Sequence, residues 1–560
     1  MKKINLALLG LVLVIAALLR FLPLGDFPPA VNWDEVSHGY NAYSILLTGR
    51  DEWGQPFPIF NFRAYGDYPL PLSMYLMIPF IFIGGLTEAM IRLPHGLAGL
   101  VTVVAVFFLA RELLKNERAA LLAALLAAVG PWYVFPSRFV TQPNLSVALT
   151  VLAMAVFLSF RKRMWGWGLA LFFLILSLFS YHTARVFSPL LLGVMLWLYR
   201  GEWLEWMRKK KKGFWLLVGM VGVFLGLWLA AVVSPVGRAR SQWVFLVDQG
   251  AVNQIIAARE ESELPAIVAR IVYNRPVYFV SHFVQNYLGY FSPGFLFFEG
   301  GTNYQFSVPG KGLLYPINLI GFYFGLVVVF LRVGRGERSW RLVLFWLLLS
   351  PVVASATKES HAVLRASTML PLPEILSACG WWWIIDFVFR KKGKWVGFGL
   401  IGVYALGLTI NVYDYYSVLG TKYAKEYDWS WQYGYKQVVS LVRSEYEGVD
   451  RVFITKKYGE PHEFVLFFWP WNPEAFRNDL SLVRYWRDGW YWVDGFGKFR
   501  FINDWEIKDK VVCGGGERCM LVSSPGNYPE QDGWNVSEGV NYLSGKSAFE
   551  ILRRGDVKKD

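Results

Sequence analysis

Acidic side chains gather in one short segment that follows the first apolar run of the chain. The segment holds Asp34, Glu35, Asp51, Glu52 and Asp67. A carboxylate beside a low-dielectric layer gains basicity, which suits a general base or a metal ligand. The alternative for Asp34 is structural, because aspartate commonly caps a helix, here one expected from Glu35 to Leu47. Residue type alone favours the cap, so a chemical role for this residue needs further support.

Arginine and histidine side chains recur where later apolar runs end. They are Arg138, His182, Arg185, His361 and Arg365. Preorganised arginine or histidine suits the charge of a bound phosphate. His361 and Arg365 are four residues apart and would face one way on a helix, whereas His182 and Arg185 are three apart across a tight turn. The alternative for each arginine is to extend toward lipid headgroups, which is the commoner role of an arginine at a helix end.

Two further groups of reactive residue types lie late in the chain. One group is Glu460, His462 and Glu463. These are metal-ligand types, but we interpret them as ordinary surface residues. Cys513 and Cys519 are expected to close a short loop if that region faces an oxidising compartment, while Cys379 lies in an apolar run and is expected to pack.

The elements that carry these residues are apolar enough for a bilayer. Of 560 residues, 55% are hydrophobic and only 18% are charged, which is too apolar for a soluble multidomain protein. We expect about eleven helices to cross a hydrocarbon core of ~30 Å. Their ranges are 4–24, 92–110, 119–135, 144–160, 165–181, 185–199, 213–234, 313–331, 340–356, 367–389 and 395–411. The net charge of +14 lies in short clusters between these runs, which does not favour nucleic-acid binding.

The basic clusters predict which connections face the cytoplasm. They occur in alternate connections, at 2–3, 111–118, 161–163, 208–212, 332–341 and 390–394. The positive-inside rule places all of them in the cytoplasm, with the N-terminus, if the proline-containing run 69–86 does not span. We therefore expect 69–86 to be a membrane-embedded outer segment. The outer loops are then 25–91, 136–143 and 235–312.

The chain is expected to divide into a membrane domain, 1–411, and an exocytoplasmic domain, 412–560. In the second part, WQYGYKQVVSLVRSEYEG has a helical pattern, whereas VDRVFIT, KVVC and CMLVSS have strand patterns. This mixture predicts a small α/β domain. We find no internal repeat of the kind that marks paired transporter halves.

The order of short motifs after the first apolar run resembles a known family. The motifs are Trp33-Asp34-Glu35, Gly39-Tyr40, Gly49-Arg50-Asp51, Gly66-Asp67-Tyr68-Pro69 and Arg92-Leu93-Pro94. In this order they resemble the first third of GT-C glycosyltransferases, in particular the protein O-mannosyltransferase and aminoarabinose-transferase branch, called glycosyltransferase family 39. The resemblance implies a sugar donor carried on a polyprenyl phosphate, an outward-facing site and inversion at the anomeric carbon.

The resemblance also implies roles for individual residues. Asp34 matches the acidic residue after the first helix that acts as the base, and Glu35 matches the second member of an Asp-Glu pair. Asp67 lies near the acidic residue that precedes the embedded segment. Two departures stand out: Tyr68 replaces a lysine of the aminoarabinose transferases, and SRFVTQPNLS offers only amides, Gln142 and Asn144, where many relatives have an acid. A metal is therefore left unassigned.

From these residues and the resemblance we expect an inverting glycosyltransferase in the plasma membrane or an equivalent membrane. Asp34 would act as base, Glu35 or Asp67 would orient a hydroxyl acceptor, and the five arginines and histidines would hold the lipid phosphate. The acceptor, a protein, lipid or polysaccharide, is left open, and no nucleotide sugar is expected. The alternatives are a transporter or flippase of lipid-linked or polar solutes, and an inactive relative that binds glycolipid.

Overall fold

The computed structural model describes residues 3–209, 211–234 and 244–555. These residues form two compact units. The helical unit comprises Met1–Leu22, His95–Ser137 and Thr141–Tyr416, and the sheet unit comprises Pro23–Pro94, Arg138–Val140 and Ser417–Asp560. This division differs from a single boundary at residue 411, because the segment 23–94 packs with the C-terminal residues. Lys2 and Lys210 of the basic clusters, and residues 235–243 of the expected outer loop, lie outside the described residues.

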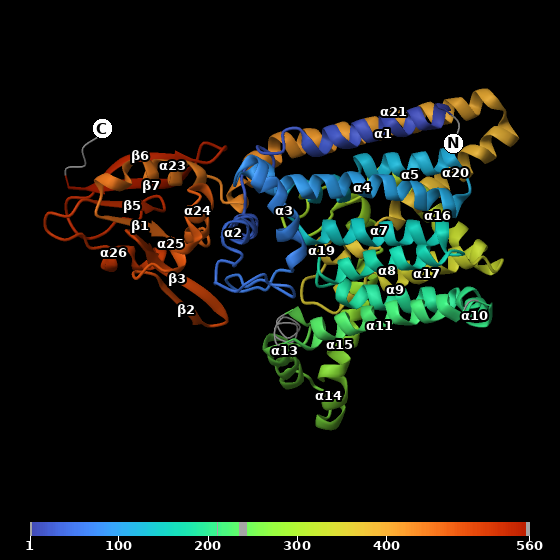
Figure 1. The fold of residues 1–560 in the computed structure, drawn as a ribbon, viewed down its shortest axis with the longest axis horizontal. Coiled ribbons are helices and arrows are strands. Elements are labelled where there is room, and N and C mark those ends of the chain that lie inside the picture. Colours follow the sequence, from blue (N-terminus) through green and yellow to red (C-terminus); the bar gives the residue numbers. More distant parts are fainter. Residues whose placement is uncertain (1–2, 210, 235–243, 556–560) are drawn as a thin grey trace. The chain divides into compact units, whose positions relative to one another are not determined.

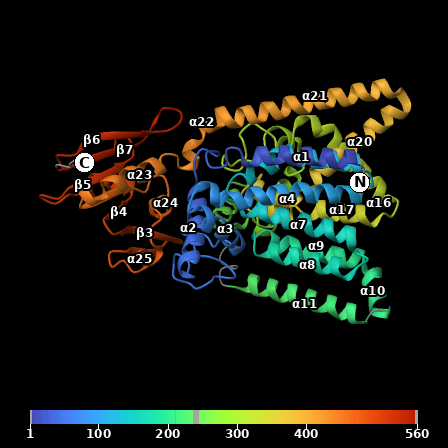
Figure 2. The ribbon, with the colours of Figure 1, turned by 45° about the horizontal axis from the view of Figure 1, so that its top comes forward.

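Long apolar helices make up most of the helical unit, and Figures 1 and 2 show the axes of α1, α7, α8, α9 and α11 running roughly parallel to one another. Its helices are α1 Lys3–Phe21, α4 Glu88–Leu114 (which begins in the sheet unit), α5 Glu117–Val129, α6 Pro131–Val134, α7 Gln142–Phe160, α8 Met164–Leu178, α9 Ala184–Leu198, α10 Arg200–Lys209, α11 Lys211–Val233, α13 Gln249–Glu260, α14 Ala266–Val272, α15 Arg275–Gly289, α16 Leu319–Gly334, α17 Arg338–Leu349, α18 Val352–Ser355, α19 Val363–Ala366, α20 Leu372–Lys392 and α21 Lys394–Val418.

The prediction of a polytopic helical membrane protein is confirmed. Each of the eleven expected ranges overlaps a helix. Among the described residues, seven helices are long and apolar enough to cross a membrane, or eight if α5 and the bent segment after it count as one span. The helices α8 and α9 have 15 residues each, which is shorter than the ~20 residues of a typical span.

The segment expected to be embedded forms a short helix of the sheet unit. This helix, α3 Pro71–Gly84, has 14 residues, with proline at its start and Pro79 inside it. Proline at the first helical position is tolerated because the missing N–H has no partner inside a helix anyway. At ~1.5 Å per residue α3 reaches only about 21 Å, too short for the core of a bilayer.

A mixed sheet of seven strands organises the C-terminal part of the sheet unit (Figure 1). The strand order is β2-β3-β4-β1-β5-β7-β6, and only the pairs of β1 with β4 and β5 are parallel. The strands are β1 Arg451–Thr455, β2 Val483–Arg487, β3 Trp490–Phe496, β4 Phe499–Ile502, β5 Cys519–Ser523, β6 Asn535–Asn541 and β7 Ser547–Arg554. The helices of this unit, besides α3, are α2 Trp33–Thr48, α22 Ala424–Glu426, α23 Tyr435–Glu445, α24 Pro461–Phe468, α25 Pro473–Arg477 and α26 Ile507–Lys510.

The α/β prediction for this region is confirmed, with one local error. The expected helix and the strands VDRVFIT and CMLVSS correspond to α23, β1 and β5. KVVC is not a strand, because Lys510 ends α26 and residues 511–513 have no regular structure. Only Val511 of its two valines is buried, in a small core with Cys513, whereas Val512 is exposed.

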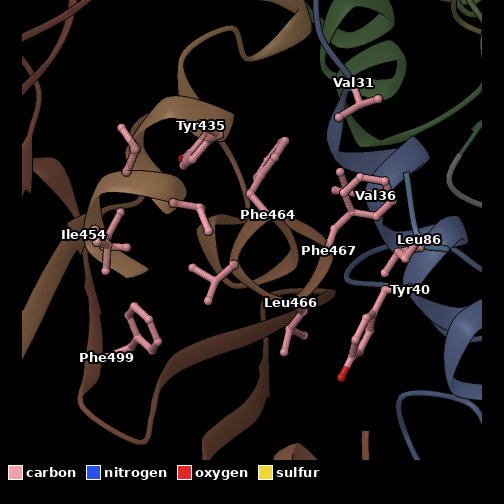
Figure 3. Close-up of a cluster of buried hydrophobic side chains, with 14 of the residues drawn as sticks. Val31, Val36, Tyr40, Leu86, Tyr435, Ile454, Phe464, Leu466, Phe467 and Phe499 are labelled. Carbon is pink, nitrogen blue, oxygen red and sulfur yellow. The ribbon is translucent and has the colours of Figure 1, made fainter. Parts of the chain in front are cut away.

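A single hydrophobic core joins the early segment to the C-terminal domain. Side chains of α2, such as Val36 and Tyr40, lie in the same core as Tyr435, Phe464 and Phe467 (Figure 3). Close approach of α2 to α24 requires a glycine, because a Cβ on Gly39 would lie 2.8 Å from Cε2 of Phe467. The burial of this shared apolar surface explains why residues 23–94 belong to the sheet unit.

Candidate active site

The start of α2 shows that Asp34 is not the helix cap. Asn32 is the N-cap, and its side chain accepts from the backbone N–H of Glu35. The Glu35 side chain in turn accepts from the backbone N–H of Asn32, which completes a capping box. The capping alternative for Asp34 is therefore wrong, and its carboxylate is available for another role.

Glu35 is a structural residue rather than one that faces a substrate. It is fully buried, and its carboxylate forms a two-point ion pair with the equally buried Arg92, with distances of 2.9 Å from Nε to Oε1 and from Nη2 to Oε2. The backbone N–H of Val140 also donates to Oε1, at 3.0 Å. Both carboxylate oxygens are thus occupied, and the expected role of Glu35 in orienting an acceptor is corrected on this ground.

Asp34 is held by a tyrosine from the loop between α2 and α3. The hydroxyl of Tyr65 donates a hydrogen bond to Oδ1 of Asp34, which is half-buried. Burial, together with the charge of Asp34, raises the pKa of Tyr65 well above its usual value, so that the phenol remains a proton donor. Among the described residues, no hydrogen bond reaches Oδ2 of Asp34. This geometry leaves one carboxylate oxygen oriented and the other available to accept a proton.

An aromatic surface supports Tyr65. Its ring stacks on Trp490 of β3, with ring centroids 5.2 Å apart, and lies 5.9 Å from the ring of Trp33. The backbone carbonyl of Tyr65 accepts from the N–H of Tyr491. The C-terminal sheet therefore fixes the position of the residue that orients Asp34. Sequence reasoning missed Tyr65 and Trp490, since nothing in their local pattern marks them.

His38 is a second residue that sequence reasoning missed. It lies four positions after Asp34 on α2, so the two residues share a helix face. Burial lowers the pKa of His38, and the charge of Asp34 opposes this shift. The spacing of four could have identified His38 from the sequence.

Asp67 lies on the same turn as Tyr65. The backbone N–H of Ala64 donates to the carbonyl of Asp67, which closes the turn, and the Asp67 carboxylate accepts from the N–H of Tyr68. The Asp67 side chain is half-buried. Tyr65 therefore links this turn to Asp34, because it lies on the same turn as Asp67 and its hydroxyl donates to Asp34.

Arg138 contacts the connection between α1 and α2. It is buried, and its Nη2 donates to the backbone carbonyls of Pro23 and Phe27 at 2.8 and 3.2 Å. Its guanidinium also lies over the ring of Phe27, 5.2 Å from the centroid. Arg138 therefore stabilises this connection, and its expected phosphate role stays a prediction.

The other four phosphate candidates lie in the helical unit, around two turns. His182 and Arg185 bracket the start of α9, and Arg185 is buried, with its Nε donating to the carbonyl of Leu178. Arg365 on α19 donates to the carboxylate of Glu359 at 2.6 Å, and its side chain keeps 22% exposure. Sequence reasoning did not foresee this acidic partner of Arg365.

The two turns come within electrostatic reach of each other. Tyr181, next to His182, is buried, and Arg365 is close enough for its charge to act on the Tyr181 hydroxyl. His361 packs against Phe295, with ring centroids 5.3 Å apart, and has a φ of 54°. Because His361 precedes α19 in a left-handed conformation, it and Arg365 do not share a helix face, contrary to the expectation from their spacing.

The amides at the start of α7 offer no second base. Asn144 donates to the backbone carbonyl of His95 at 2.8 Å, and both Asn144 and Gln142 are buried. Their chemistry excludes proton abstraction, as the sequence predicts. Of the three predicted catalytic carboxylates, Asp34 and Asp67 are half-buried, whereas Glu35 is fully buried.

The group Glu460, His462 and Glu463 is buried, not exposed as expected. His462 and Glu463 lie in the first turn of α24, beneath α2, and Glu52 lies beside them. Burial raises the pKa values of Glu52 and Glu460 to about 7 and lowers that of His462 to about 3. Sequence reasoning failed here because the surface that covers these residues comes from a distant part of the chain.

Comparison with known proteins supports the expected resemblance. Residues 67–229 match the model of the family described as dolichyl-phosphate-mannose-protein mannosyltransferase. No curated protein matches the chain. The structure of ArnT from Cupriavidus metallidurans bound to undecaprenyl phosphate aligns with a TM-score of 0.54 at 12% identity, over 99% of this chain and 98% of that chain. The apo state of the same protein aligns with a TM-score of 0.52 at 12% identity, over 97% of each chain.

An archaeal structure shares the fold over part of its length. Oligosaccharyltransferase AglB from Archaeoglobus fulgidus, in complex with an inhibitory peptide and a dolichol-phosphate, aligns with a TM-score of 0.51 at 13% identity, over 83% of this chain. This chain spans 64% of the length of that protein. The structural matches and the family match agree with each other. Together they confirm that the chain is similar to GT-C glycosyltransferases of the protein O-mannosyltransferase and aminoarabinose-transferase type.

Proposed function

We propose that the protein is an inverting glycosyltransferase that transfers a sugar from a polyprenyl-phosphate donor to an acceptor hydroxyl on the non-cytoplasmic side of the membrane. The observation that carries this proposal is the pair of Asp34 and Tyr65, in which one oxygen of a half-buried carboxylate is oriented by a buried phenol. This is the arrangement that a positioned general base requires.

The proposed reaction is a single displacement. The acceptor hydroxyl donates its proton to Oδ2 of Asp34 while its oxygen attacks C1 of the sugar. The bond from C1 to the phosphate oxygen breaks, and the lipid phosphate leaves with the electron pair. Attack opposite the leaving group inverts the configuration at C1. Tyr65 keeps its proton throughout and holds Asp34, and Asp67, on the adjoining turn, orients the acceptor.

The departing phosphate needs positive charge. We assign this role to Arg185 and Arg365, with His182 and His361 beside them, on the turns that lie within electrostatic reach of each other. Support comes from two similar folds, since the ArnT structure has undecaprenyl phosphate bound and the AglB structure has a dolichol-phosphate bound. Glu359 neutralises part of the charge of Arg365, so ligand binding would have to compete with this ion pair.

The placement of the site outside the cytoplasm has its own support. Cys513 and Cys519 form a disulfide in the sheet unit, the unit that also holds Asp34. Disulfides persist in oxidising compartments and are rare in the cytosol. Together with the basic clusters of the connections, this bond favours an outward-facing sheet unit.

The substitution Asp34→Asn tests the proposal. Purified protein in liposomes would be given polyprenyl-phosphate donors that carry radiolabelled hexoses or pentoses, with peptide, lipid and polysaccharide acceptors. Loss of a general base predicts a fall in transfer rate of about 10²–10⁴-fold. Asp509→Asn, at an exposed carboxylate of α26, is the matched control and should leave the rate unchanged. Full activity in folded Asp34→Asn would overturn the proposal, as would movement of the donor across the bilayer without any sugar transfer.

A further inference from the structure

A buried cluster of ligand-type side chains lies between α2 and α24, within the sheet unit. Glu52, His462 and Glu463 are each at most 3% exposed, and one ligand atom from each lies within 4.8 Å of the others. Oε2 of Glu52 and Oε2 of Glu463 have no hydrogen-bond partner among the described residues. Buried polar atoms without partners are rare in folded proteins, so two unpaired carboxylate oxygens in one cluster point to a site that a ligand would complete.

The charges of the cluster favour a cation. Arg484 approaches Glu52 at only 3.9 Å, and its guanidinium stacks on the ring of Trp53 at 3.7 Å. Lys456 forms its ion pair with Asp494 instead of with the cluster. Two buried carboxylates therefore lie close together, and a single arginine at the limit of ion-pair distance compensates for their charge. A divalent ion between them would supply the charge that this interior lacks.

The imidazole of His462 is oriented as a metal ligand. Its Nε2 faces Oε1 of Glu463 at 3.8 Å, and its Nδ1 faces Oε2 of Glu460 at 3.5 Å. The other oxygen of Glu460 accepts from Nε1 of Trp490, which fixes this carboxylate. A carboxylate behind the far nitrogen of a ligating histidine sets the tautomer and directs the free lone pair of Nε2 at the metal.

We propose that Glu52, His462 and Glu463 bind one divalent cation of the zinc type, with Glu460 as the partner that orients His462. An imidazole together with carboxylates suits zinc or a similar first-row ion, whereas calcium and magnesium prefer all-oxygen sites. Zinc bonds to nitrogen and oxygen measure ~2.0–2.2 Å, so its ligands lie up to about 4 Å apart, close to the spacing found here. The ion connects the loop after α2 to the C-terminal domain and stabilises the unit that carries Asp34.

Metal content and thermal stability of the full-length protein test this inference. Protein purified in detergent without chelator should contain one zinc per chain, measured by mass spectrometry of the metal. Treatment with EDTA should lower the Tm of the sheet unit, and added Zn²⁺ should restore it, with a rise that grows with the logarithm of free Zn²⁺. Cobalt should bind the stripped protein and give visible absorption bands.

Two variants and a control decide the location of the ion. His462→Ala and Glu52→Gln should lose the zinc and make the Tm insensitive to EDTA, whereas Glu474→Gln, at an exposed glutamate of α25, should retain both properties. Equal zinc content in all variants would overturn the proposal, because the ion would then lie elsewhere. A wild-type Tm that neither EDTA nor Zn²⁺ changes would also overturn it and would indicate a proton shared between Glu52 and Glu463. The wild-type measurements need no variant to fold.

Discussion

Substitution of Glu35 by glutamine separates a structural role from a catalytic one. The carboxylate accepts four hydrogen bonds, two from Arg92 and one each from the backbone of Val140 and Asn32. Glutamine keeps the shape of the side chain but places an NH₂ group where an acceptor oxygen was. Arg92 would then remain buried without a countercharge, although the carbonyl of Ala30 still accepts from its Nη2.

The size of the effect follows from the burial of the pair. Removing one partner of a buried ion pair costs about 3–5 kcal/mol, because the other charge loses its compensation. In a domain of 150–250 residues, each kcal/mol lowers the Tm by about 2–4 °C. The Tm of the sheet unit of Glu35→Gln should therefore fall by roughly 6–20 °C. The double variant with Arg92→Gln should recover part of this loss, since it no longer buries an isolated charge.

Tryptophan fluorescence during heating in detergent measures this loss, and sugar transfer is measured well below both transitions. At that temperature Glu35→Gln should retain a large part of the wild-type transfer rate. Glu447→Gln is the matched control, because its side chain is 96% exposed and its contact with Lys498 is 3.9 Å long. A Tm equal to that of the wild type, together with abolished transfer, would refute the assignment and show that Glu35 contacts a substrate.

Two further predictions concern the orientation of Asp34 and the stability of the C-terminal domain. Tyr65→Phe removes the hydrogen-bond donor to Asp34. A hydrogen bond to a charged group contributes about 1.5–3 kcal/mol, so the transfer rate should fall by roughly 10–100-fold. Tyr413→Phe, at an exposed tyrosine, is the control and should leave the rate unchanged. An unchanged rate would show that Asp34 needs no orientation. Replacement of Cys513 and Cys519 by serine opens a loop with a sequence separation of 6 and should cost about 2 kcal/mol, seen as a lower Tm under non-reducing conditions. Equal Tm values of the variant and the oxidised wild type would contradict this estimate.

Those parts of the fold that depend on local pattern could be predicted from the amino-acid sequence. Every expected apolar run overlaps a helix, because a chain in lipid must satisfy its backbone groups within each spanning segment. The strands β1 and β5 and the pairing of Cys513 with Cys519 were also predicted, since their apolar composition and short spacing are local features. Asp34 was singled out by its place after the first helix, which is again a property of sequence order.

The roles of the polar residues depend on contacts between distant parts of the chain. Asp34 and Glu35 are neighbours in sequence, yet one is half-buried beside Tyr65 and the other is buried against Arg92. The difference arises because the two side chains leave α2 in different directions and meet partners that lie far from them in the chain. In the same way, the interior position of His462 depends on a core formed with α2, and no local pattern around residue 462 encodes that contact.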